Sequence, residues 1–336
     1  MRVIFIHGDI SDYLGSSVLH GLLSMDKIEV IDYPRAYNQY VEYKNDLSDK
    51  IRGGGFTIFF QHRIKRVNWL HVEYDYIRTG NYDLIIFSDI QANYGLFLQF
   101  FPYLKKEKTI LLDGSDSPTV FGFSGHFWRL PFFWFFPRVF NRFAYYKREI
   151  SPLTIKYLYY KMLPLFLAAR LTPPKFIRSI SFSIPEIHIV KSQQKVKDFV
   201  THIVDPEVSS NIPGSSISSV FNSQDEYFAD IRSSKFGITT KRAGWDCLRH
   251  YEIAANGAVI CFKDLDGKPP NCAPHGLIPN KNCLSYSNYQ DLVSQIECLS
   301  NEKYDQMLRE SYLWIQENST LNRARWLLTD FASLKK

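Results

Sequence analysis

The stretch that decides the fold is residues 235–262, which read KFGITTKRAGWDCLRHYEIAANGAVICF. Alternating apolar residues over 236–239 predict a strand, and a glycine-containing loop follows. Apolar residues at helical spacing over 245–256, stopped by Gly257, predict a helix. The apolar run 258–262 then predicts a buried strand. Strand, helix and strand in this order are typical of a parallel α/β sheet.

The predicted helix carries two side chains suited to a charged ligand. Arg249 and Glu252 are three positions apart, so they lie on neighbouring positions of one helical face. A helix that begins after a glycine loop presents free backbone N–H groups and the positive end of its dipole, which bind phosphate. Lys241 and Arg242 in the loop add cationic groups for a diphosphate. The alternative is a purely structural helix.

This stretch resembles the donor-binding motif of GT-B glycosyltransferases, R-x-x-E-x-x-x-x-G followed by an (A/V)-V-I strand. Here the motif consists of Arg249, Glu252, Gly257 and residues 258–260. The resemblance implies an α/β fold of two Rossmann-like domains that face each other across a cleft, with the nucleotide sugar held by the second domain. The predicted donor-binding residues are Lys241, Arg242, Gly244, Arg249, His250 and Glu252. For His250, simple packing is the alternative.

One position departs from the pattern of many retaining GT-B enzymes, which carry a second glutamate eight positions before the one that matches Glu252. Here Gly244 stands at that position. The departure favours transfer with inversion, in which a base takes the proton of the acceptor hydroxyl. GT-B enzymes usually stabilise the leaving diphosphate with basic side chains and helix N-termini. We therefore expect no metal and no cofactor beyond the nucleotide-sugar substrate.

The N-terminal half predicts four strands that alternate with helical stretches: 2–7, 27–33, 82–89 and 108–112. Ligands of such sheets bind beyond the carboxyl ends of the strands. Asp113 and Asp116 follow the last of these strands and are the leading candidates for the base. Asp9 and His7, at the end of the first strand, are the second choice. The alternative for Asp113 and Asp116 is that they cap the following turn.

Residues 125–178 differ in composition from the rest of the chain. They hold ten Lys or Arg against the single acid Glu149, together with sixteen aromatic side chains. Pro131 and Pro137 argue against a continuous membrane-spanning helix. Two interpretations remain: an aromatic core with a solvated basic face, or a surface that enters the interface of an anionic membrane.

Within this basic aromatic segment, three residues are candidates for contact with an acceptor or a membrane: Trp134, Lys147 and Arg148. Residues 145–149 form a compact polar group that follows the aromatic run. They predict either an exposed helix face or an anchor for a phosphate of a lipid carrier.

The chain divides into three predicted parts. Residues 1–175 form an acceptor-side Rossmann-like domain, 176–310 form the nucleotide-sugar-binding domain, and 311–336 form a helix that packs back on the first domain. Within the second part, residues 191–199 predict a loop that leads into a helix. The N-terminus is too short for a signal peptide. The five cysteines lie in the last third of the chain without metal-type pairing, which indicates a reduced, cytosolic protein.

The amino-acid composition excludes some classes of protein. An apolar fraction of 45% and a net charge of +6 exclude a disordered chain or a collagen. The sequence predicts a glycosyltransferase that moves a sugar from a nucleotide sugar to a surface-glycan or lipid-linked acceptor, in the cytoplasm or on the inner membrane face. The alternative is a two-domain protein that binds a glycan or nucleotide without turnover. Nucleic-acid binding is disfavoured, because the basic residues cluster with long aliphatic and Phe runs rather than with spaced stacking residues.

Overall fold

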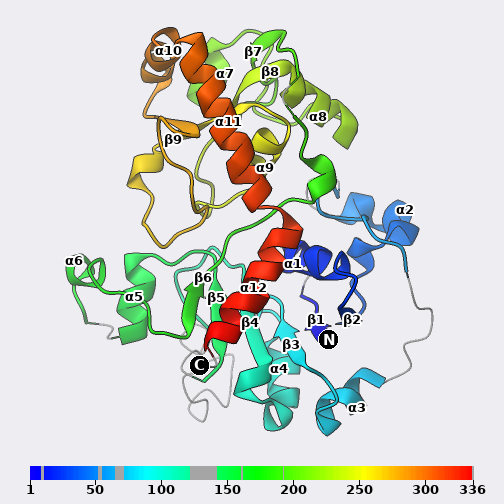
Figure 1. Ribbon diagram of the computed structural model, residues 1–336. Coiled ribbons are helices and arrows are strands. Elements are labelled where there is room, and N and C mark those ends of the chain that lie inside the picture. The colour runs from blue at the N-terminus through cyan, green and yellow to red at the C-terminus, as the bar shows by residue number, and fades with distance from the viewer. Residues whose placement is uncertain are drawn as a thin grey trace. The chain divides into compact units, whose positions relative to one another are not determined.

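The computed structural model describes residues 1–8, 11–51, 55–64, 72–121, 142–159, 162–191 and 193–334, and it comprises two compact units (Figure 1). Unit 1 consists of Met1–Ser181, Asn271–Ala273 and Thr320–Lys336. Unit 2 consists of Phe182–Pro270 and Pro274–Ser319. The boundaries therefore fall after Ser181 and Ser319, later than the predicted positions 175 and 310.

Unit 1 is built on a six-stranded sheet in the order β2-β1-β3-β4-β5-β6, in which every pairing is parallel. The strands are β1 (Arg2–Ile6), β2 (Glu29–Tyr33), β3 (Leu84–Phe87), β4 (Thr109–Asp113), β5 (Ala144–Lys147) and β6 (Ile177–Ser179). Strands β3, β4 and β5 are buried along their whole length, as expected for a parallel sheet covered on both faces. Residues 145–147 thus belong to a strand, which corrects the predicted helix face.

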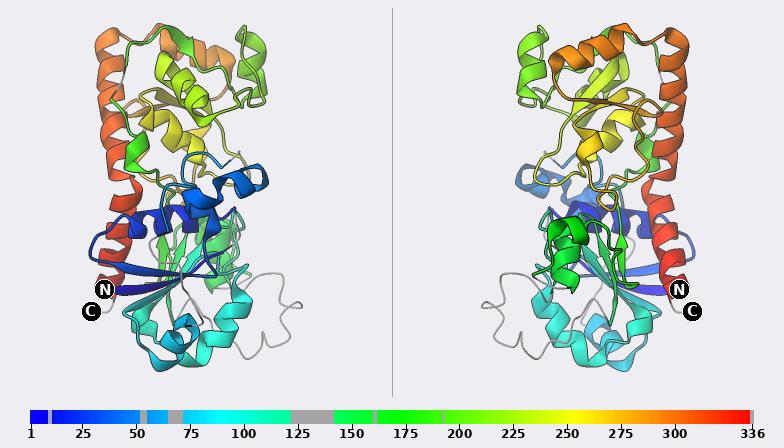
Figure 2. Two further views of the ribbon diagram at one scale, coloured as in Figure 1. Left: turned by 90° about the vertical axis from the view of Figure 1, so that its right-hand side faces the viewer. Right: turned by 90° about the vertical axis from the view of Figure 1, so that its left-hand side faces the viewer.

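Helices cover both faces of this sheet, with α1 and α12 on one face and α3 and α4 on the other (Figures 1 and 2). The helices are α1 (Tyr13–Leu23), α2 (Lys44–Leu47), α3 (Val72–Thr79), α4 (Tyr94–Phe100), α5 (Pro152–Tyr159), α6 (Leu165–Ala168) and α12 (Thr320–Leu334). Short 3₁₀ turns span Tyr37–Gln39, Val41–Tyr43, Ser48–Lys50, Phe101–Tyr103 and Lys106–Lys108. Phe97 of α4 meets Phe87, Phe121 and Phe143 edge to face, with ring centroids 5.4–5.8 Å apart. Some aromatic side chains of the basic aromatic segment, such as Phe143, are therefore core.

The C-terminal helix α12 packs against α1 within unit 1. A Cβ on Gly21 of α1 would lie 2.1 Å from the Thr320 carbonyl oxygen, so only glycine permits this approach. Asp330 of α12 accepts hydrogen bonds from Tyr146 Oη at 2.8 Å and from Arg178 Nε at 3.1 Å. These contacts tie the end of the chain to strands β5 and β6.

Unit 2 contains a four-stranded parallel sheet in the order β10-β9-β8-β7. Its strands are β7 (Lys197–Phe199), β8 (Ser234–Thr239), β9 (Val259–Lys263) and β10 (Cys283–Tyr286). Its helices are α7 (Pro206–Asn211), α8 (Gln224–Ser233), α9 (Leu248–Ala255), α10 (Tyr289–Glu297) and α11 (Asn301–Glu317), with 3₁₀ turns at Glu186–His188 and Leu265–Gly267. The strand β7 replaces the predicted loop and helix over 191–199.

Helix α9 begins three residues later than the pattern predicts, because Asp246 is engaged elsewhere. Its carboxylate accepts the Phe182 backbone N–H at 2.8 Å and the Tyr251 hydroxyl at 2.9 Å. Residues 245–247 therefore stay in the loop, and α9 starts at Leu248 without a side-chain cap. None of the helices within the described ranges is both long and apolar enough to cross a membrane.

Candidate functional site

The first candidate site lies at the carboxyl edge of the unit 2 sheet. Strands β7 and β8 are parallel, so the loops that follow them leave the same edge. The loop after β7 carries His202, and the loop after β8 leads through Lys241 and Arg242 into α9. These loops bring together residues that lie far apart in the sequence.

Arg249, near the start of α9, is oriented by His202. Its Nη1 lies 3.4 Å from His202 Nδ1, and His202 Nε2 lies 3.0 Å from the Ile217 carbonyl oxygen. A guanidinium can only donate, so Nδ1 accepts and Nε2 carries the hydrogen that Ile217 receives. Burial, together with the charges of Arg249 and Arg242, lowers the pKa of His202 to about 4. The imidazole is therefore neutral at pH 7, and it orients Arg249 without neutralising it.

Glu252 is held from the neighbouring helix α8. Its Oε2 accepts the hydroxyl hydrogen of Tyr227 at 2.9 Å, and both side chains are buried. Burial, with the adjacent carboxylate, raises the pKa of Tyr227 well above its usual value. The phenol therefore remains a donor to Glu252, which lies one helical turn from Arg249.

The loop after β8 presents two exposed cations, Lys241 and Arg242. Lys241 Nζ lies 5.2 Å from the centroid of the Trp245 ring, a cation–π distance. The Arg242 backbone N–H donates to the carbonyl of the buried Gly244 at 3.0 Å. This short turn holds both cationic residues at the sheet edge beside the start of α9.

His250 points into the interior of unit 2, away from a ligand position. It is fully buried, with Nε2 2.9 Å from the Trp245 carbonyl oxygen and Nδ1 3.1 Å from Thr239 Oγ1. Its ring stacks on Phe262 at 4.5 Å. One ring nitrogen therefore contacts the loop and the other the end of β8, which favours the packing alternative over donor contact.

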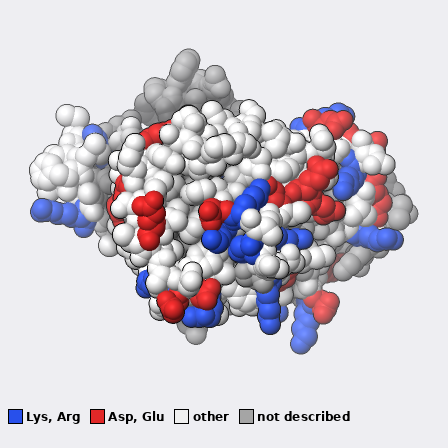
Figure 3. Space-filling model, turned by 90° about the horizontal axis from the view of Figure 1, so that it is seen from above, with Lys and Arg blue, Asp and Glu red and all other residues white. Residues whose placement is uncertain are grey.

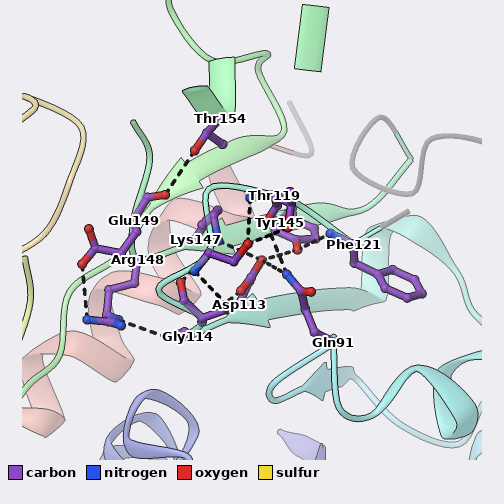
Figure 4. Close-up of polar contacts among 12 residues, drawn as sticks. Gln91, Asp113, Gly114, Thr119, Phe121, Tyr145, Lys147, Arg148, Glu149 and Thr154 are labelled. Carbon is purple, nitrogen blue, oxygen red and sulfur yellow. Dashed lines mark hydrogen bonds and ion pairs between the residues drawn. The ribbon is translucent and has the colours of Figure 1, made fainter. Parts of the chain in front are cut away.

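The second candidate site surrounds the carboxyl end of β4 in unit 1 (Figure 4). Asp113 is fully buried. Its Oδ2 accepts from Tyr145 Oη at 2.5 Å, from Lys147 Nζ at 3.1 Å and from Gln91 Nε2 at 3.2 Å. Its Oδ1 accepts the Ser115 backbone N–H at 3.0 Å. A carboxylate with four donors and no exposed surface does not reach an acceptor hydroxyl, so Asp113 is a structural group here.

Arg148 extends this network toward the surface. Its Nε donates to the Gly114 carbonyl at 3.1 Å, its Nη1 to Glu149 at 3.3 Å and its Nη2 to Asp116. The Arg148 side chain is almost fully buried, whereas that of Asp116 is 40% exposed. Of the two predicted bases that follow β4, Asp116 is therefore the one that keeps access to solvent.

The structure also locates the predicted acceptor or membrane residues. Lys147 is fully buried in its ion pair with Asp113, and Arg148 is enclosed by its own partners. Neither is exposed to a membrane or a lipid phosphate. Asp9 and Trp134 lie outside the described residues.

The sequence alone does not predict two residues of the unit 2 site, His202 and Tyr227. His202 lies just after a strand, which could have indicated it, but β7 is short and charged, and the sequence pattern over 191–199 predicts a loop that leads into a helix. No sequence pattern indicates the role of Tyr227, because that role depends on the packing of α8 against α9.

Comparison with known proteins identifies the fold. No family model matches the sequence, and no curated protein matches it. The structure of Anabaena HepE in complex with UDP matches with a TM-score of 0.57 and 12% identity, over 99% of this chain and 100% of that chain. A glycosyltransferase from Rickettsia africae matches with a TM-score of 0.56 and 9% identity, over 100% and 98% of the two chains. The trehalose-6-phosphate synthase OtsA matches with a TM-score of 0.51 and 9% identity, over 99% of each.

These neighbours are GT-B proteins, so the chain has the GT-B fold. The predicted fold class is confirmed.

Proposed function

We propose that this protein is a glycosyltransferase that takes its sugar from a nucleotide-sugar donor. The observation that carries the proposal is the charged Arg249, oriented by a neutral histidine beside Glu252 at the carboxyl edge of the unit 2 sheet. The fold supports it, because solved structures of HepE, which shares this fold, contain UDP or UDP-glucose. A guanidinium whose charge is not neutralised by its positioning partner suits a diphosphate.

Each donor-site residue has a distinct proposed role. Arg249, with Lys241 and Arg242, binds the diphosphate, assisted by the uncapped first turn of α9. Glu252 accepts hydrogen bonds from hydroxyl groups of the nucleotide sugar. Gly244 keeps the loop compact, and His250 supports it from within.

The proposed reaction is a metal-independent transfer with inversion. The acceptor hydroxyl oxygen attacks the anomeric carbon, the bond from that carbon to the diphosphate oxygen breaks, and the base takes the hydroxyl proton. The cationic side chains stabilise the negative charge that develops on the leaving diphosphate. Among the described residues, Asp116 is our candidate for the base, and Asp9 is retained as a second candidate.

We further propose a surface glycan or a lipid-linked glycan as the acceptor, met in the cytoplasm or at the inner membrane face. The basic aromatic composition of residues 125–178 supports this. A binding protein without turnover is the alternative, and one observation favours it: both Asp113 and Asp116 form ion pairs. The two functions differ in turnover and share nucleotide binding.

The test is calorimetric titration with UDP, followed by an assay of UDP release from UDP-sugars. We expect Arg249→Ala to weaken UDP binding about ten- to hundredfold, since a charge-assisted hydrogen bond contributes roughly 1.5–3 kcal/mol. Arg309→Ala is the matched control, because Arg309 is an exposed arginine on α11. Equal UDP affinity in both variants would refute the donor site, whereas binding without UDP release would favour the alternative.

A further inference from the structure

A cluster of large apolar side chains surrounds α6 on the surface of unit 1. We call it the α6 patch, and its members are Tyr159, Met162, Leu165, Phe166, Leu167 and Leu171. Their exposure ranges from 39% for Leu167 to 75% for Met162. Scattered exposed apolar residues are ordinary, but six within thirteen positions form a patch of the kind that marks an interaction surface.

The α6 patch is held in place by ordered structure. Ala168 of α6 is fully buried in the unit 1 core, in the same cluster as Ile155 and Leu158 of α5. Tyr159 Oη donates to the Thr172 carbonyl oxygen at 2.8 Å, which joins the two sides of the α6 turn. Because the inner side of α6 is anchored, the outward position of its apolar side chains is a property of the fold.

The charged residues that flank the α6 patch in the sequence are all basic. Arg170 and Lys175 are exposed, and neither forms an ion pair with another residue in the described part of the chain. No Asp or Glu occurs from residue 150 to residue 185. The lobe at the left of Figure 3, on the side where Figure 1 draws α6, shows Lys and Arg but no Asp or Glu.

We propose that the α6 patch docks on the surface of an anionic lipid membrane. Apolar side chains that enter the acyl boundary, beside cations that meet the headgroups, are the two components of interfacial binding. A second copy of the chain is disfavoured as the occupant, because it would bring Arg170 and Lys175 near their own equivalents without an acid to compensate. The proposal is independent of the donor site, and it places membrane contact at α6 instead of at Lys147 or Arg148.

The test is flotation of the full chain with vesicles of phosphatidylcholine, with or without phosphatidylglycerol. We expect binding to the anionic vesicles, weakened by salt because the Debye length shortens. The double variant Leu165→Ser/Phe166→Ser should bind at least about tenfold more weakly, and Arg170→Glu/Lys175→Glu should behave alike. Leu313→Ser on α11 is the matched control, since Leu313 is 54% exposed and Leu165 is 51% exposed.

Two results would overturn the proposal: no flotation of the wild type, or equal flotation of the wild type and the α6 variants. A dimer in sedimentation that Leu165→Ser/Phe166→Ser dissolves, without lipid binding, would also overturn it and assign the patch to a second copy. Thermal unfolding confirms that each variant is folded. UDP titration of the same variants separates the two proposals, because the α6 variants should keep UDP affinity whatever their flotation.

Discussion

At the residue scale, the unit 2 site depends on the proton that His202 carries. A carboxylate at this position would orient Arg249 equally well but would neutralise its charge. The neutral imidazole accepts from Arg249 through Nδ1 and donates to Ile217 through Nε2, so it orients the guanidinium and leaves its charge for a ligand. A protonated imidazole would lose this acceptor and repel Arg249.

This arrangement predicts a pH dependence of stability. Burial lowers the pKa of His202 from its ordinary value of 6.5 to about 4, so the unfolded state binds the proton more readily than the folded state. The contribution of neutral His202 to the free energy of unfolding is fully present above pH 6.5 and is lost as the pH falls from about 6.5 to about 4. We expect the wild type to lose roughly 1–3 kcal/mol more than His202→Gln over this range. The measurement is the free energy of unfolding in urea at a series of pH values. If this free energy depends on pH in the same way for the wild type and for His202→Gln, the prediction is wrong.

The two aspartates after β4 should respond differently to substitution. Asp113→Asn removes the charge partner of the buried Lys147 and should cost about 3–5 kcal/mol of folding free energy. Asp116→Asn removes a half-exposed partner of Arg148 and should cost about 1 kcal/mol or less. If Asp116 is the base, its variant keeps UDP affinity and loses turnover. Unfolding midpoints and UDP release measure both effects, and a stable Asp113→Asn variant would show that this carboxylate is not essential to the fold.

Some roles of single residues can be predicted from the sequence, and others cannot. Arg249 and Glu252 were found because their spacing lies within one helix, where the periodicity is local. The role of Asp113 was not readable, because its charge partner Lys147 lies on another strand and both became buried only through the pairing of β4 with β5. Without knowledge of this pairing, a lysine is expected to be exposed to solvent.

At the element scale, the contact between α1 and α12 depends on the absence of a side chain at Gly21. Gly21→Ala places a Cβ against the Thr320 backbone carbonyl, which cannot move aside as a side chain can. We expect a loss of roughly 1–3 kcal/mol or more. Gly95→Ala in α4 is the matched control, because a Cβ there meets no atom within 4 Å; it should be neutral or stabilising by about 0.5–1 kcal/mol. Thermal unfolding compares them, and equal melting temperatures would contradict the packing argument.

Elements with a strong local signal were predictable, and those that depend on tertiary context were not. The strand β9 and the end of α9 follow from an apolar run and Gly257, which has a positive φ of 73°. In contrast, β7 is a three-residue strand at the sheet edge, only partly buried, with the sequence Lys-Asp-Phe. Neither alternation nor hydrophobicity distinguishes such a strand from a loop.

At the scale of the whole molecule, the chain crosses between the units more than once. Residues 271–273 belong to unit 1 although unit 2 flanks them on both sides in the sequence, and residues 320–336, which follow unit 2, also belong to unit 1. The α/β pattern predicts parallel sheets in both halves of the chain, and the resemblance to GT-B enzymes implies two Rossmann-like domains. The short return of Asn271–Ala273 was not predictable, because it rests on a backbone hydrogen bond from Ala273 N–H to the Arg148 carbonyl at 3.1 Å, which no sequence pattern encodes.

The division into units predicts where a nucleotide acts. His202, Tyr227, Arg249 and Glu252 all belong to unit 2, so UDP at about one hundred times its Kd should stabilise that unit by about 2.7 kcal/mol. In hydrogen exchange of the full chain, we expect UDP to slow exchange in the loops after β7 and β8 and at the start of α9, while α1 and α12 exchange as before. Arg249→Ala should abolish this protection and Arg309→Ala should retain it. Protection confined to unit 1 would place the nucleotide at the β4 edge instead, and Asp116 and Arg148 would then be the residues to test.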